Sequence, residues 1–252
     1  MKRPSVAMMQ PTFLPWTGYF ALLAAADVFV FLDDFQFCRR SFHHRNRLLL
    51  PDGTVTWITL PVAHGGRVPL REARPLLDET FRRRFLETLH HAWTRCAHRD
   101  GALALVEPWI RRDWENLAAM NAALVREIAA RLGFSPRFVE SSSLGSAGRR
   151  SARIADLLRR LGAGSYLAAR GSLGYMVEDG VFPLPDVETY FQRYEPAPYP
   201  QLPGRPFVPY LSVLDPLARH GADATREIVL AGAGPFEPWD EAVAGMAPGG
   251  RP

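Results

Sequence analysis

Residues 5–34 read SVAMMQPTFLPWTGYFALLAAADVFVFLDD, and this run has the pattern of one βαβ unit. The apolar residues 5–9 are typical of a short buried strand, and Pro11 and Pro15 exclude a helix from the loop that follows. An alanine- and leucine-rich helix is predicted over 19–26. The β-branched and aromatic residues 28–32 predict a second buried strand. Strand, loop, helix and strand in this order predict a parallel sheet.

The rest of the chain continues the alternation of strands and helices. Apolar residues at helical spacing indicate two helices between about 77 and 133, which we expect to form a hairpin inserted into the sheet or packed on it. Ser151 is the expected N-cap of a later helix. Further strands are predicted at 54–60, 137–140, 166–168 and 187–191.

These elements predict an α/β fold with a Rossmann-like, mainly parallel sheet. The predicted organisation is one domain over residues 1–235, followed by a Gly/Pro-rich tail over 236–252 that we expect to be loosely ordered. The chain of 252 residues is long enough to bury a full hydrophobic core without disulfide bonds or a structural metal.

Composition narrows the class of protein further. With 47% hydrophobic and 22% charged residues, the chain is an ordinary globular protein. The two cysteines, Cys38 and Cys96, exclude a disulfide framework and a cysteine zinc site. The longest apolar stretch, residues 19–32, is too short to cross a bilayer, and no signal peptide is evident. We therefore expect a cytoplasmic protein without a membrane span.

The charge pattern indicates a small anionic ligand. The formal net charge is +4, and Lys2 is the single lysine among the basic residues. The arginines are scattered over helices and loops, so nucleic acid is not expected as a partner.

Polar residues gather where the predicted strands end, which is where open α/β sheets bind ligands. Gln10 to Tyr19 follow the first strand, and Asp33 to Phe37 follow the second, with Arg45 to Arg47 beyond them. Ser141 to Ser151 precede a helix, and Tyr199 to Gln201 form the last patch.

Each patch has a structural and a functional interpretation. Asp33 and Asp34 form either a turn or a carboxylate pair that acts as base or binds a metal. Gln10 and Pro11 form either a rigid turn or part of a binding loop, and residues 45–47 either a solvated loop or an anion clamp. Small residues and two arginines before the helix at Ser151 favour a phosphate site, because backbone N–H groups there can bind an anion.

Several of these motifs resemble the WbqC-like family. The resemblance begins at residues 9–20 and continues through 32–37, 45–47 and 57–62. It resumes at 142–144, 148–151, 161–163 and 166–167, and ends at 199–201 and 209–215. It covers about residues 5–230. The chain departs from the pattern at Ala168-Ala169-Arg170-Gly171, where the family usually has a Ser-Gly pair.

The family resemblance implies a role in O-antigen or natural-product biosynthesis, with transfer of glycine or another aminoacyl unit to a sugar. A weaker similarity links the layout to Rossmann-like HIGH-motif nucleotidyltransferases. The histidines of that motif are absent, because Pro15 and Trp16 stand where the first is expected.

The leading hypothesis is therefore a transferase that passes an aminoacyl or acyl unit from a phosphate-bearing donor to an amino-sugar or other small acceptor. The alternatives are an ATP-dependent nucleotidyltransferase or adenylate-forming ligase, and a non-catalytic ligand- or RNA-binding module. ATP and Mg²⁺ are the candidate cofactors. The oligomeric state stays open.

Roles follow for the polar residues under this hypothesis. The candidate catalytic residues are Asp33, Asp34 and Tyr19, and either aspartate is the candidate metal ligand. The candidate substrate-binding residues are Gln10, Gly18, Gln36, Arg45, Asn46, Arg47, Ser142, Ser143, Arg149, Arg150, Ser151, Tyr199 and Gln201.

Overall fold

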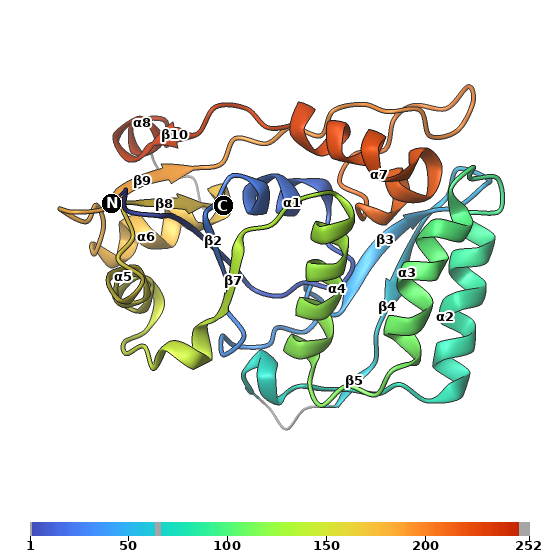
Figure 1. The fold of residues 1–252 in the computed structure, drawn as a ribbon, viewed down its shortest axis with the longest axis horizontal. Helices are drawn as coiled ribbons and strands as arrows, with labels where there is room; N and C mark the ends of the chain where they lie inside the picture. The colour runs from blue at the N-terminus through green and yellow to red at the C-terminus, as the bar shows by residue number, and fades with distance from the viewer. Residues whose placement is uncertain (1, 64–66, 247–252) are drawn as a thin grey trace.

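The protein, represented by a computed structural model, has a six-stranded central sheet with helices on both faces (Figure 1). The structure describes residues 2–63 and 67–246. In spatial order the sheet consists of β10 (Glu237–Pro238), β9 (Glu188–Phe191), β8 (Ser165–Ala168), β1 (Ser5–Met9), β2 (Val28–Phe31) and β7 (Arg137–Glu140). All neighbouring strands are parallel except β10, which runs antiparallel to β9. The predicted α/β fold with a mainly parallel sheet is confirmed.

Two hydrophobic cores cover the two faces, as the alternation of side chains along the strands requires. In β1 and β2, Ala7 and Phe29 belong to one core, while Val6 and Val28 belong to the other. The first core includes α1 (Thr17–Ala24) and α7 (Leu214–Ala231), and the second includes α5 (Arg150–Arg160), α6 (Leu173–Asp179) and α8 (Trp239–Ala244). The sheet is therefore a buried middle layer.

The predicted helical insertion is present between β2 and β7 and contains three helices where the pattern indicated two. They are α2 (Glu79–Ala92), α3 (Arg99–Arg111) and α4 (Leu117–Arg131). The additional helix α3 carries Gly101 and Pro108, two residues that disfavour helix, and its buried face compensates for them. In Figure 1 these helices lie to the right of the central sheet.

The predicted strand at 54–60 lies outside the central sheet. It is β4 (Val55–Thr59), which pairs only with β3 (Arg45–Leu49), and a second small sheet joins β5 (Val62–Ala63) to β6 (Arg74–Pro75). Three short 3-10 helices span Leu70–Glu72, Ser141–Leu144 and Arg170–Ser172.

The tail differs from the expectation of loose order. Residues 237–244 form β10 and α8, and Trp239 lies 6.0 Å from Phe182 and 5.8 Å from Phe191 between ring centroids. This aromatic packing fixes a segment whose glycines and prolines suggested disorder. Residues 247–252 lie outside the described part of the chain.

Candidate functional site

The carboxyl ends of β1 and β8 lie side by side at the centre of the sheet. From β1 the chain proceeds to β2 and β7 on one side, and from β8 it proceeds to β9 on the other. In α/β sheets such a reversal of strand order leaves a crevice that binds ligands. A cavity of about 460 Å³ lies at this point.

We call it the switch-point cavity. The residues that line it are Met8, Met9, Gln10, Leu32, Phe35, Arg150, Tyr166, Ala169, Gly171, Ser172 and Tyr175. Most of its wall is apolar, and Gln10, Ser172, Tyr175 and Arg150 supply the polar groups. Burial raises the pKa of the Tyr175 phenol, so this group stays protonated at neutral pH and can donate a hydrogen bond.

Arg150 begins α5 at the rim of this cavity. Its guanidinium pairs with Glu178 at 3.2 Å and with Asp179 at 3.1 Å, and lies 5.8 Å from the Tyr175 ring centroid. The Ser151 amide also donates to Asp179, at 3.1 Å. The N-cap of α5 is Arg149, so Ser151 as N-cap was wrong. Arg149 is exposed. The charge of Arg150, the other arginine of the predicted phosphate site, is already largely neutralised by Glu178 and Asp179 of α6.

Asp33 and Asp34 bind the loop that follows β7. Asp33 accepts hydrogen bonds from the Ser142 amide at 2.9 Å, the Ser142 hydroxyl at 2.5 Å and the Ser141 hydroxyl at 3.0 Å. Asp34 accepts from Ser141 at 2.5 Å and pairs with Arg153. These contacts tie the ends of β2 and β7 together, so the two carboxylates act as structural clamps in this structure.

Neither carboxylate presents an open set of metal ligands. Their oxygens are engaged by serine and arginine donors. Over residues 2–63 and 67–246, no group of three or more His, Cys, Asp or Glu side chains is placed to hold a metal ion. The residues therefore do not fit the predicted magnesium site.

Tyr19 and Gly18 lie in the core beside the cavity. The Tyr19 ring is fully buried, its hydroxyl donates to the Gln10 carbonyl at 3.3 Å, and burial raises the phenol pKa well above its usual value. Gly18 accepts a hydrogen bond from Gln192 through its carbonyl. These positions are suited to supporting the Gln10 loop rather than to contacting a substrate.

The Arg45–Arg47 patch holds the backbone of two distant segments. The Asn46 amide is buried and donates to the carbonyls of Phe13, at 3.2 Å, and Leu14. Arg47 donates to the carbonyl of Tyr210 at 3.1 Å, and the Arg45 guanidinium lies 4.2 Å from the Trp57 ring centroid. The patch is neither a solvated loop nor an open anion clamp.

The remaining predicted residues lie apart from the cavity. Tyr199 donates to Asp215 at 2.9 Å, and Gln201 makes two hydrogen bonds to Val208, so both fold the proline-rich segment onto α7. Ser143 donates to the Glu140 carbonyl at 2.7 Å, and Gln36 is exposed in an isolated bridge to Pro69.

A second, larger hollow of about 1180 Å³ adjoins the switch-point cavity, and we call it the aromatic groove. Its lining shares Ala169 and Gly171 with the cavity. The lining residues are Trp16, 169–171, 192–198, Tyr210, 231–235 and Glu237. The two hollows therefore share part of one wall, formed by Ala169 and Gly171.

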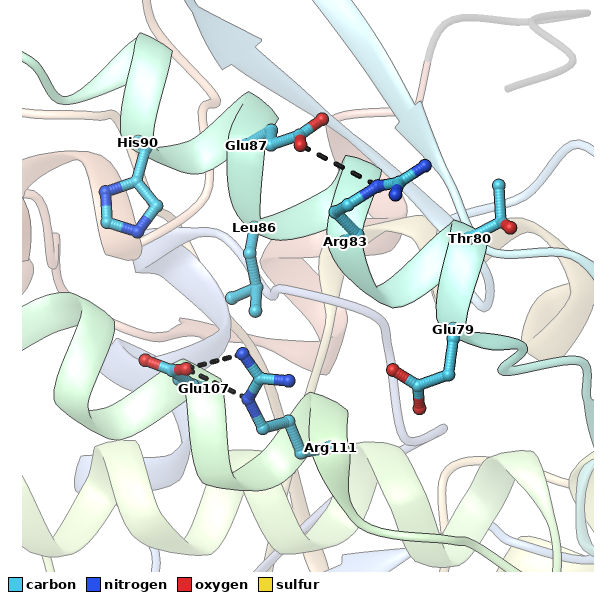
Figure 2. A pocket seen from close by; sticks show the side chains of 8 residues that line it. All are labelled: Glu79, Thr80, Arg83, Leu86, Glu87, His90, Glu107 and Arg111. Atoms are coloured by element: carbon cyan, nitrogen blue, oxygen red, sulfur yellow. Dashed lines mark hydrogen bonds and ion pairs between the residues drawn. The ribbon is translucent and has the colours of Figure 1, made fainter.

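A third cleft, between α2 and α3, is a different kind of surface (Figure 2). Its charged side chains pair with one another along their own helices, Arg83 with Glu87 at 3.8 Å and Arg111 with Glu107 at 2.8 Å. It lies away from the carboxyl edge of the sheet. Such (i, i+4) pairs are typical of solvated helix surfaces, so this cleft does not carry the function.

Sequence reasoning missed most residues of the two hollows. Tyr175 and Ser172 carry no motif that points to a site, whereas Phe35 lies within residues 32–37 of the family resemblance. Trp16 and Tyr210 belong to the motifs of the family resemblance, and only this membership could have marked them as candidate site residues. Gln10 and Arg150 are the predicted residues that the structure brings into the switch-point cavity.

Comparisons with known proteins identify relatives but no activity. The model of the WbqC-like protein family matches residues 10–227. A Mycobacterium tuberculosis (strain ATCC 25618 / H37Rv) protein called "Uncharacterized protein Rv1507c" is 31% identical over 222 residues, which cover 87% of this chain and 95% of that protein. No solved structure matches. Among the described residues, none of the helices has the length and apolar character needed to span a membrane.

Replacing Asn46 by leucine should lower the free energy of unfolding by about 2–5 kcal/mol, because two buried carbonyls lose their donor. Chemical denaturation of the variant measures this loss. The exposed Gln36→Leu variant is the control and should change stability by less than about 0.5 kcal/mol. Equal stability of the two variants would show that the amide does not hold the loop.

His43 should make stability fall with acid. Burial lowers its pKa from 6.5 to about 4, so the unfolded chain binds a proton more readily than the folded one between these values. The stability that depends on neutral His43 is fully present above pH 6.5 and is lost as the pH falls toward 4. Between pH 7 and 4.5 the loss should be about 2 kcal/mol. The difference between wild type and His43→Gln isolates this part, and identical pH dependence of the two proteins would exclude it.

Proposed function

We propose that this chain, which belongs to the WbqC-like protein family, is a biosynthetic transferase. It passes an aminoacyl or acyl unit, with glycine as one candidate, to the amino group of an amino-sugar or another small acceptor. One observation carries the proposal: two hollows meet at Ala169 and Gly171, at the point of the sheet where α/β proteins bind ligands.

The donor occupies the switch-point cavity in this proposal. The apolar wall, formed by residues such as Met8 and Leu32, accepts the uncharged part of the donor. The Gln10 carboxamide can both donate and accept hydrogen bonds, and the protonated Tyr175 phenol can donate one. The exposed Arg149 and the Arg150 guanidinium are the candidate phosphate contacts, and a phosphate would have to displace Glu178 and Asp179 from Arg150.

The acceptor occupies the aromatic groove, and the reaction takes place beside Gly171. The amine of the acceptor attacks the acyl carbon of the donor, so that the new C–N bond forms while the bond to the leaving group breaks. The proton of the amine passes to Glu195, an exposed carboxylate of the groove. Holding both reactants in one geometry supplies much of the rate enhancement of such a step.

A second candidate is nucleotidyl transfer or carboxylate adenylation with ATP in the same cavity. The sheet order favours it, because β9-β8-β1-β2-β7 is the order of a nucleotide-binding α/β sheet. A non-catalytic RNA-binding module has less support, because the described arginines lie on separate faces and many pair with carboxylates.

Filling the junction between the two hollows tests the proposal. A Cβ added at Gly171 meets no atom within 4 Å, so Gly171→Leu should fold normally and obstruct the meeting point. Gly101 is equally free of neighbours and lies on α3, so Gly101→Leu is the matched control. Thermal unfolding is measured with ATP, other nucleotides, nucleotide-sugars and aminoacyl donors, each with and without Mg²⁺.

A ligand at 100 times its Kd should stabilise wild type and Gly101→Leu by about 2.7 kcal/mol and Gly171→Leu by much less. Product formation from the best donor, followed by mass spectrometry, should show the same dependence on Gly171. Pyrophosphate release from ATP would favour nucleotidyl transfer. Equal ligand responses in the two leucine variants would refute the site.

A further inference from the structure

Three aromatic side chains meet in the aromatic groove. The Trp16 ring lies 5.2 Å from Tyr194 and 5.4 Å from Tyr210 between centroids. A Cβ at Gly18 would lie 2.3 Å from the Trp16 ring, so the absence of a side chain there fixes the place of the indole. The rings form a rigid, partly exposed aromatic surface inside a polar hollow.

Tyr210 is held there in a strained conformation. Its side chain is 48% exposed and its φ is 59°, a left-handed value that costs a non-glycine residue about 1–2 kcal/mol. Arg47 donates to the carbonyls of Pro209 and Tyr210, at 3.4 and 3.1 Å, and so supports this turn from β3. Because the Tyr210 ring is half exposed, its packing in a core does not account for this strained backbone. Strain of this kind is typical of ligand sites.

The charged residues of the groove balance one another. Arg170 pairs with Glu237, and the exposed side chains of Arg193 and Glu195 add one charge of each sign. A phosphate or a strongly cationic ligand would therefore find no excess of opposite charge. The groove combines flat apolar faces with several hydrogen-bond donors and acceptors.

We infer that the aromatic groove binds a pyranose ring, which stacks one face on the exposed Tyr210 ring beside Trp16 and directs its hydroxyl groups to Arg193 and Glu195. A pyranose presents an apolar C–H face and an equatorial rim of polar groups, which is the complement of this lining. This inference rests on the proposed function and specifies its acceptor as a sugar.

Binding of sugars to the full chain tests the inference without requiring turnover. The probes are methyl glycosides of neutral hexoses, 2-amino-2-deoxyhexoses and N-acetylhexosamines, observed by saturation-transfer NMR and by Trp fluorescence. Tyr210→Gly removes the ring and relieves the left-handed strain, so it should keep or raise the melting temperature. Its affinity for the best glycoside should fall at least tenfold.

Two controls separate stacking from other effects. Tyr210→Phe keeps the ring and should bind the glycoside within about threefold of wild type. Gly101→Leu changes α3, outside both hollows, and should leave glycoside binding unchanged. In the bound state, saturation should be strongest at the C–H protons of one face of the pyranose.

The inference is overturned if no glycoside of the panel binds, or if Tyr210→Gly binds as wild type does. Binding of adenosine or a quaternary ammonium ion in place of sugars would also overturn it. Donor binding with no sugar binding would leave the transferase proposal standing. Sugar binding without any donor or product would contradict the transferase and retain the sugar site.

Discussion

Two buried carboxamides hold the connection from β1 to α1 in place. This connection, residues 10–16, contains two prolines, which have no N–H, and a left-handed Leu14, so it cannot satisfy its own carbonyl groups. Asn46 donates to Phe13 and Leu14, and Asn121 donates to Pro11 at 3.1 Å. An unpaired buried carbonyl is costly, so the loop depends on these donors from β3 and α4.

Both hollows depend on this arrangement, because Gln10 and Trp16 stand at the two ends of the held loop. The β3–β4 hairpin and the helical insertion therefore support the loop between β1 and α1. Through Asn46 and Asn121 they position the loop that faces the ligands. Among the described residues, Leu14, Arg40, Arg150 and Tyr210 are the non-glycine residues with positive φ, and two of these four, Arg150 and Tyr210, line a hollow.

The sequence predicted the sheet well and the site only in part. Short apolar runs locate β1, β2 and β8, because largely buried parallel strands leave a strong local pattern, and β-branched and aromatic residues locate the more exposed β7 and β9. Polar residues at strand ends did not identify the site, because the same side chains serve in hydrogen bonds within the protein and in contacts to a ligand. Asp33 and Asn46 illustrate this: both are polar residues beside the site, and both are occupied by backbone or serine groups. Tyr175 and Tyr194 enter the hollows through tertiary packing, which has no local signature.

The turn after β8 connects the family resemblance to the choice of acceptor. At this turn the chain has Ala168-Ala169-Arg170-Gly171, and Arg170 pairs with Glu237 of β10. The pair joins the C-terminal segment to the groove and cancels a carboxylate that would otherwise attract a cation. No atom lies within 4 Å of a Cβ built at Gly171, so the wall that the two hollows share has open space at this position. Under the proposed function, Arg170 favours an acceptor of low charge in the groove, and Gly171 leaves space beside it.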